Sequence, residues 1–321
     1  MDLIYMNGSR MDIGVLHDYK LDLAYGKEEN NFELLIPSSQ HCCNSGFFLY
    51  IDNTEYGGMI DSIQSDTDQQ EVTYAGRTWH GILDSKVITP DPGADYLVLS
   101  GDANGIILTL LKRIGLADLF TVAGASSGLT LTNYRVPRYV HAYEGIRKML
   151  DSVSAKLTFR FVNGMVTLAA VPRVDYTQQE EFDSDKIGFK CKRNYRPVNH
   201  LICLGRGELA AREIVHLYVD PLGNISKTQT QTGLWERTEV YDFPNAESLT
   251  ELEQGGMERL KELAVADEIK INLTEDDGGY DIQDVVGATD NITGLSVAAV
   301  ISKKIVTIDR GEIEISYEVE E

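Results

Sequence analysis

The sequence predicts an α+β protein that is predominantly β, with two β regions on either side of a mixed one. Short apolar runs that end at Gly, Pro or Asn recur towards both ends of the 321 residues. Apolar residues at helical spacing gather between about 96 and 186. The same stretch holds Asn163-Gly164 between two β runs, the strongest short-range signal for a hairpin. A chain of this length is expected to form two or three domains.

Residues 1–95 are expected to be the first β domain. Pro90-Asp91-Pro92-Gly93 is rich in residues that break helices and strands, and it predicts the first domain boundary. Residues 79–88 are apolar and fit either a short helix or a strand. Strands are expected at 32–36 and 46–51, and a hairpin at 55–63 and 71–77.

Residues 96–186 are expected to be an inserted domain with helices and strands. Asp102 can cap a helix whose apolar residues recur from Ile106 to Ile114, with Gly115 as its stop. A second helix is expected at about 142–153, directly before the hairpin around Asn163-Gly164. The acidic residues 178–185 are interpreted as a linker.

Residues 187–321 are expected to return to strands. Ser248 and Glu251 form the Ser-x-x-Glu capping box of a helix near 248–265. Residues 222–266, which include this helix, are a candidate to pack with the inserted domain. Gly311 is the expected turn between the last two strands. The expected strands are 199–204, 213–219, 268–273, 295–300, 304–309 and 312–319.

The charge of the chain is strongly negative and unevenly distributed. There are 29 Lys+Arg and 50 Asp+Glu, a net charge of −21 that argues against tight DNA binding. Residues 186–216 sum to +5 and residues 241–291 to −11. Such segregation indicates either surfaces that meet one another or solvated faces with chance clustering. The N-terminus lacks the features of a signal peptide, and no run reaches the ~20 apolar residues of a membrane span.

The sequence offers few candidates for chemistry, and we expect no catalytic residue, metal or cofactor. His41-Cys42-Cys43 lacks a second ligand pair at zinc spacing, and Cys191 and Cys203 lie in strand-like runs where cysteine is usually a small apolar residue. Four cysteines make no disulfide framework, so a reducing compartment is the default. Residues 124–128 resemble no nucleophile elbow, and the acidic residues 275–281 lack the register of a calcium-binding loop.

Motifs near both ends of the chain resemble those of a known protein family. The N-terminal set starts at Gly57-Gly58 and continues through Tyr74-Ala75-Gly76-Arg77-Thr78-Trp79 to Pro90. The C-terminal set comprises residues 280–287, 303–311 and 315–319. Together they resemble the tail hub proteins of siphophages that infect Gram-positive bacteria, which are related to the hubs of contractile tails and of type VI secretion spikes. Gln283 departs from the pattern, because a glycine is expected there, and this puts the local turn in doubt.

The resemblance implies a structural protein of the virion tail, at the baseplate or tail tip, made in the cytoplasm of the host bacterium. In this family, two tube-type β-barrel domains per chain flank an inserted domain, and three chains close into a ring of pseudo-sixfold symmetry. The ring adapts the sixfold tail tube to threefold parts and leaves a channel for DNA. The implied partners are two further copies, the tail tube or distal tail protein, the tape measure protein, and spike, tail fibre or LysM-type hub proteins.

A second function remains open at this point. A tail-associated cell-wall hydrolase, either peptidase or glycosidase, can be built on a hub scaffold, but such enzymes usually carry an added catalytic domain. We expect none here, since the last expected strand reaches the end of the sequence. In the hub interpretation the negative charge would keep DNA from binding to the channel wall, because acidic side chains repel DNA phosphates within a Debye length of roughly 8 Å. The competing interpretation places the acidic residues on the outer face, for solubility.

Overall fold

The computed structural model describes residues 1–124, 126–178, 187–264, 267–274, 279–289, 292 and 296–320. Contacts divide the chain into two compact units. The first contains residues 1–188, 271–288 and 296–321, and the second contains residues 189–270 and 289–295. The domain boundaries expected near 95 and 186 stay predictions.

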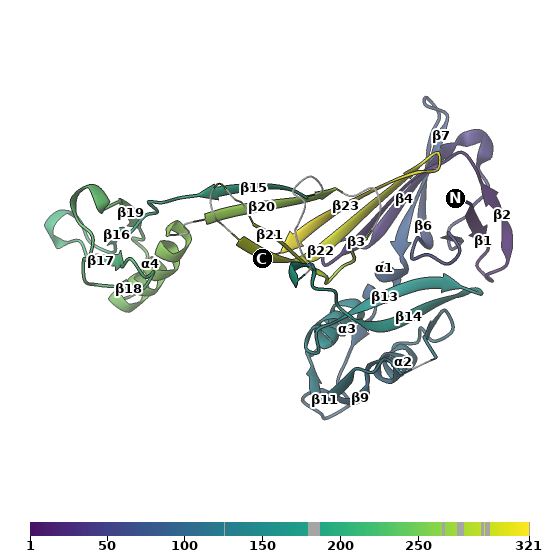
Figure 1. Cartoon of the computed structure of the whole chain (residues 1–321), viewed down its shortest axis with the longest axis horizontal. Helices are drawn as coiled ribbons and strands as arrows, with labels where there is room; N and C mark the ends of the chain where they lie inside the picture. The colour runs from purple at the N-terminus through teal and green to yellow at the C-terminus, as the bar shows by residue number, and fades with distance from the viewer. Residues whose placement is uncertain are drawn as a thin grey trace. The chain divides into compact units, whose positions relative to one another are not determined.

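Strands from the two ends of the sequence share one sheet. The strand order is β15-β20-β23-β22-β3-β4-β7-β6-β5-β1-β2, and β21 pairs with β22 off this path. The long strands are visible side by side in Figure 1. The bounds are β1 (Leu3–Met6), β2 (Asp12–Leu16), β3 (Lys20–Gly26), β4 (Asn31–Pro37), β5 (Phe48–Tyr50), β6 (Gly57–Asp66), β7 (Glu71–Thr78), β15 (Ile187–Arg193), β20 (Asp267–Thr274), β21 (Val285–Thr289), β22 (Ser296–Asp309) and β23 (Glu312–Glu320).

The predicted class, α+β and predominantly β, is confirmed. The strands from the two ends of the chain, which were expected to form separate β domains, pair with one another instead. Strand β3 pairs antiparallel with β22 along seven residues, from Lys20 opposite Asp309 to Gly26 opposite Lys303. Leu21 and Leu23 of β3 are buried and stand opposite the buried Ile308 and Val306 of β22, so the two strands share one core face. In the described part of the chain the pairings form an open path, so neither implied barrel is seen as a closed sheet. The two strands expected at 295–300 and 304–309 form one strand, β22.

A mixed layer of helices and short strands completes the first unit. Figure 1 shows helices α2 and α3 packed beside the hairpin of β13 and β14. Trp79 connects this layer with the N-terminal strands, because its ring stacks on Phe48 and on Phe161, with centroids 6.2 and 5.3 Å away. The bounds are α1 (Trp79–Asp84), β8 (Val87–Ile88), β9 (Leu97–Asp102), α2 (Ala103–Arg113), β10 (Phe120–Val122), β11 (Thr130–Val136), β12 (Val140–His141), α3 (Ala142–Asp151), β13 (Ala155–Val162) and β14 (Met165–Pro172).

Local signals in the sequence locate these elements well. The Asp102 carboxylate accepts hydrogen bonds from the N–H groups of Asn104 and Gly105, so α2 begins where its cap predicts. Asn163 and Gly164 both have positive φ, 52° and 76°, as the turn between β13 and β14 requires. The ambiguous residues 79–88 form α1 and the short strand β8.

The second unit is a four-stranded sheet covered by one helix. The strand order is β18-β17-β16-β19, and α4 contacts β16 and β17. Ser248 caps α4 by accepting a hydrogen bond from the Glu251 N–H, as predicted, while the Glu251 carboxylate accepts a hydrogen bond from the N–H of Glu247 and not from that of Ser248. The bounds are β16 (His200–Leu204), β17 (Ile214–Val219), β18 (Ile225–Ser226), β19 (Thr238–Asp242) and α4 (Leu249–Leu263). Short 3₁₀ helices lie at Ser38–Gln40, Tyr176–Gln178, Leu209–Ala211 and Gly233–Trp235.

None of the helices in the described ranges combines the length and the apolar character that a membrane span needs.

Candidate functional site

A cluster of buried ionic side chains lies inside the first unit. The Lys304 ammonium is 2.7 Å from Glu55 Oε1, and the two side chains are only 8% and 14% exposed. The other carboxylate oxygen of Glu55 is 3.8 Å from His80 Nε2. The His80 ring is enclosed by aromatic rings, with the Phe159 centroid 3.6 Å away and the Tyr25 centroid 4.6 Å away. This part of the cluster therefore joins β22, the loop before β6, and α1.

The cluster continues through a second lysine. Lys156 Nζ is 2.7 Å from Asp284 Oδ2 and 3.5 Å from Asp281 Oδ2. The Asp284 carboxylate, which is fully buried, also accepts hydrogen bonds from the N–H groups of Val174 and Asp281. The Lys156 pairs tie β13 to the loop before β21.

Burial and neighbouring charges set the protonation of these groups. Burial lowers the pKa of His80 well below its usual range, and the charges of Lys304 and Arg147 add to the effect. Burial alone would lower the pKa of Lys304, but the carboxylates of Glu55 and Asp281 outweigh it and raise that pKa. Burial, followed by the charge of Glu55, raises the pKa of Asp281. The cluster thus holds a charged Lys304 near the neutral His80 imidazole, and its largely buried geometry suits a structural role.

The sequence alone did not identify this cluster. Asp281, Asp284 and Lys304 lie in the C-terminal motifs that resemble tail hubs, while Glu55 lies just before the N-terminal ones. Lys156 is the local sequence feature that could have indicated this cluster, because it is a charged residue in a largely apolar strand.

Gln283 occupies the position where the family resemblance leads us to expect glycine. Its φ is +74°, in the left-handed region that glycine adopts most easily. The side chain is buried, and its Nε2 donates a hydrogen bond of 3.3 Å to the Arg147 carbonyl. The turn therefore keeps a glycine-like backbone, and a hydrogen bond compensates for the strain.

Replacing Gln283 should separate these two contributions. Gln283→Ala keeps the strained φ and removes the hydrogen bond, so we expect the free energy of unfolding to fall by about 1 kcal/mol. Gln283→Gly also removes the bond but relieves about 1 kcal/mol of strain, so it should be close to wild type. Chemical denaturation of the three proteins measures both differences. A glycine variant as unstable as the alanine variant would contradict the strain argument.

Glycines of the N-terminal motif allow very close backbone contacts. A Cβ added at Gly58 would lie 2.1 Å from the Arg77 carbonyl oxygen, and one at Gly76 would lie 2.0 Å from that of Met59. Next to them, Arg77 forms a bidentate pair with Asp61, at 2.7 and 2.8 Å. Hydrogen bonds from Arg77 lower the pKa of the Asp61 carboxyl. The motif thus specifies how β6 and β7 pair.

The residues considered for metal binding or catalysis have structural partners. The Tyr74 hydroxyl lies 2.7 Å from His41 Nδ1 and accepts hydrogen bonds from the N–H groups of Cys42 and Cys43. Cys203 packs in the core of the second unit, while the side chain of Cys191 lies outside the described part. No group of three or more metal-ligating residues occurs within the described ranges.

The serine-containing loop at 124–128 supports a helix cap. The hydroxyls of Ser126 and Ser127 donate hydrogen bonds to the Asp102 carboxylate, at 2.6 and 2.8 Å. The bond from Ser126, followed by that from Ser127, lowers the pKa of Asp102 to about 2. The acidic residues 275–278 and residues 179–185 of the expected linker lie outside the described residues.

The edge of the large sheet exposes a row of apolar side chains. Strand β2 pairs with β1 on one side, and no strand of the described part pairs with its other side. Met11, Ile13 and Val15 are 60%, 52% and 39% exposed. A free backbone edge beside an apolar row is suited to pairing with another chain.

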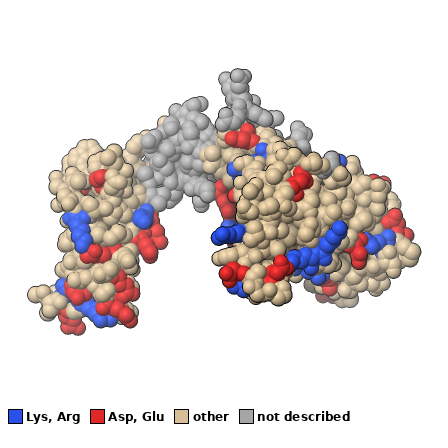
Figure 2. All heavy atoms as spheres, turned by 90° about the horizontal axis from the view of Figure 1, so that it is seen from below, with Lys and Arg blue, Asp and Glu red and all other residues tan. Residues whose placement is uncertain are grey.

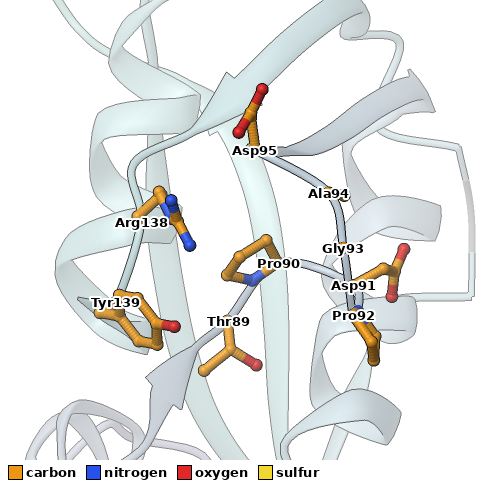
Figure 3. Close-up of a pocket in the computed structure, with 9 residues that line it drawn as sticks. All are labelled: Thr89, Pro90, Asp91, Pro92, Gly93, Ala94, Asp95, Arg138 and Tyr139. Atoms are coloured by element: carbon orange, nitrogen blue, oxygen red, sulfur yellow. The ribbon is translucent and has the colours of Figure 1, made fainter.

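A hollow of about 500 Å³ lies at the end of the mixed layer. It is bounded by the loop at 89–95 on one side and by Arg138 and Tyr139 on the other (Figure 3). The Arg138 guanidinium lies 5.5 Å from the centroid of the Tyr139 ring.

Acidic and basic side chains do not gather on separate parts of the surface shown in Figure 2. Figure 2 shows acidic and basic side chains interspersed on the face that it displays, without a continuous face of either sign. The expectation that the +5 and −11 segments form complementary surfaces stays a prediction.

No family model matches the chain, and no curated protein matches it in sequence. Several solved structures are similar to it. A tail protein from Neisseria meningitidis MC58 has a TM-score of 0.44 at 13% identity, covering 100% of this chain and 96% of that one. The 43 kDa tail protein of prophage MuSo2 from Shewanella oneidensis has a TM-score of 0.47 at 12% identity, and the match covers 100% of this chain and 98% of that one. Prophage tail protein gp18 from Listeria monocytogenes EGD-e has a TM-score of 0.47 at 11% identity, and the match covers 99% of this chain and 94% of that one. All three of these structures are described as tail proteins.

Proposed function

We propose that this chain is a structural protein of a phage tail or of a phage-derived injection particle, acting as the hub of the baseplate or tail tip. Three copies form a ring of pseudo-sixfold symmetry, which joins the sixfold tail tube to a threefold spike or tip and leaves a channel for DNA. The chain has no catalytic task in this role.

The free edge of the large sheet is the observation that carries the proposal. A ring built from one repeated contact needs an interface whose two sides differ, so that each copy binds the next in the same sense. The open strand path has two different ends, and β2 offers unpaired backbone groups beside Met11, Ile13 and Val15. Pairing with a neighbouring copy would cover this edge, which would otherwise invite aggregation.

The motifs near the two chain ends support a rigid subunit of this kind. The glycines at β6 and β7 fix one strand pair, and the buried ion pairs tie β22 to the loop before β6 and β13 to the loop before β21. A ring around a channel needs such rigid subunits, because interface geometry repeats from copy to copy. We further propose that Asp and Glu dominate the channel wall and repel DNA phosphates.

Light scattering on the purified protein tests the proposal. We expect the mass of a trimer at micromolar concentration, and Ile13→Lys should release monomers because it places a charge in the apolar row of β2. Ile63→Lys is the matched control, since Ile63 is 40% exposed on β6, pairs with Tyr74 of β7, and is separated from β2 by β5 and β1 in the strand order. A wild-type monomer would overturn the ring, and a trimeric Ile13→Lys protein would overturn the part assigned to β2.

A further inference from the structure

A chain of hydrogen bonds links two histidines and a glutamate in the second unit. His200 on β16 lies 2.7 Å from Glu236 Oε1 through its Nδ1 and 2.9 Å from His216 Nδ1 through its Nε2. The histidines come from the neighbouring antiparallel strands β16 and β17, where Tyr218 stands directly opposite His200 and His216 lies diagonally across from it. The inner histidine is therefore held from both sides, by a carboxylate and by a second imidazole.

This chain runs from a buried end to a solvent-exposed one. Leu201 and Cys203 belong to the core that β16 and β17 form with α4, so His200, which alternates with them along β16, lies on the opposite face of the sheet. His200 is only 7% exposed, and the Tyr218 ring stacks on it with centroids 4.3 Å apart. His216, in contrast, is exposed. Protons therefore enter the chain from solvent at His216.

The carboxylate determines where the protons lie when both histidines are neutral. A carboxylate only accepts hydrogen bonds, so His200 donates its Nδ1–H to Glu236, and its Nε2 accepts. His216 must then donate its own Nδ1–H to His200 across the 2.9 Å contact. The Nε2 of His216 is the nitrogen that takes up the next proton.

The first and the second added proton have different effects on the pair. After the first, one N–H still lies between the rings, and the positive charge is stabilised by the nearby Glu236 carboxylate. After the second, all four ring nitrogens carry a proton, so two N–H groups face each other where the nitrogens are 2.9 Å apart. Neither of them can accept, and the bond between the rings is lost.

The groups around the pair do not compensate a second positive charge. Within the described ranges, the hydrogen bonds and ion pairs of the two histidines include one carboxylate, that of Glu236. Tyr218 is the other titratable group packed against the rings, and it stays neutral in acid. The cations of the adjoining segments are placed elsewhere: Arg196 lies over the Trp235 ring, and Arg237 donates to the Arg196 carbonyl.

We infer that His200 and His216 form a pH-sensitive switch in the second unit: at neutral pH the bond between their rings fastens β17 to β16 on the sheet face opposite α4, and acidification releases the His216 ring to solvent. The backbone ladder between the two strands stays in place, so the change is local. The switch does not depend on the proposed ring.

Hydrogen–deuterium exchange of the full chain, read by mass spectrometry, tests the switch. We compare exchange at about pH 7.5 and about pH 5.5, on either side of the range in which histidine usually changes charge, after correction for the intrinsic pH dependence of exchange. In wild type, we expect the protection of β16 and β17 to fall about tenfold on acidification, the effect of losing one hydrogen bond to a charged group.

Two variants locate the origin of the response. In His216→Asn the amide can donate to His200 in place of the imidazole N–H but does not titrate, so the protection of β16 and β17 should change less than about twofold. His17→Asn is the matched control, because His17 is an exposed histidine between β2 and β3. This control should respond to acid as wild type does.

Nitrogen-15 NMR of the histidine rings supplies a second readout. His200 and His216 should titrate as a coupled pair, with steps that belong to both rings, whereas His17 should titrate in one step. A pH response that persists in His216→Asn, or two rings that titrate independently, would overturn the switch. Loss of protection throughout the first unit as well would also overturn it, because general unfolding in acid would then explain the result.

Discussion

Replacing Lys304 by methionine is expected to lower the free energy of unfolding by about 3–5 kcal/mol, the usual cost of breaking a buried ion pair from one side. Methionine fills much of the same volume, so the loss comes from the charge. It leaves the Glu55 carboxylate, 14% exposed, without its ammonium partner at 2.7 Å. For a unit of this size the melting temperature should fall by about 10 °C.

The neighbouring lysine provides the matched control. Lys303 pairs with Glu29 at 2.7 Å, but it is 23% exposed and Glu29 is 44% exposed. Lys303→Met should therefore cost less than about 1 kcal/mol, as surface pairs do. Thermal unfolding followed by circular dichroism measures both variants. Equal losses at the two positions would show that burial of the pair does not decide the effect.

A double variant examines the mechanism further. Lys304→Met combined with Glu55→Gln removes both charges, so no uncompensated charge stays buried. We expect it to recover more than half of the loss of Lys304→Met, because replacing a whole buried pair is often close to neutral. A double variant as unstable as the single one would mean that packing around residue 304 is responsible.

Adding one methyl group at Gly76 should destabilise the protein by about 3 kcal/mol. The new Cβ would lie 2.0 Å from the Met59 carbonyl oxygen and 2.9 Å from the Asp61 backbone nitrogen. Both atoms belong to the backbone of β6, paired with β7, so the clash is relieved only if the strands separate. Circular dichroism in increasing urea measures the loss.

Gly105→Ala is the corresponding control for Gly76→Ala. Gly105 lies inside α2, and an added Cβ would meet no atom within 4 Å. Alanine favours the helix over glycine by up to about 1 kcal/mol, so this substitution should stabilise the protein. If Gly76→Ala were equally harmless, the close approach of β6 and β7 would not limit stability.

Much of the local structure was predictable from the sequence. Asp102 before a run of helically spaced apolar residues marked the start of α2, and Ser248 with Glu251 marked the start of α4. Asn163-Gly164 marked the hairpin turn between β13 and β14. These signals worked because a cap or a tight turn depends on residues within a few positions of one another.

Long-range pairing was not predictable in the same way. The pairing of β3 with β22 joins residues about 280 positions apart, and apolar alternation alone does not say which strands become neighbours. The sequence-based expectation of separate strands at 295–300 and 304–309 was wrong for this reason. The buried cluster likewise gathers Glu55, Lys156, Asp284 and Lys304 from distant segments.

The sequence by itself determined the α+β, predominantly β class, the helix starts, the hairpin turn and the resemblance of the end motifs to tail hubs. Only the tertiary structure decided that both ends of the chain share one open sheet, that Lys304 and Asp284 are buried ion partners, and that Gln283 adopts a glycine-like φ. The physical reason is distance along the chain. Caps and turns are fixed by neighbouring residues, whereas edges, ion clusters and hollows exist only once remote segments have packed together.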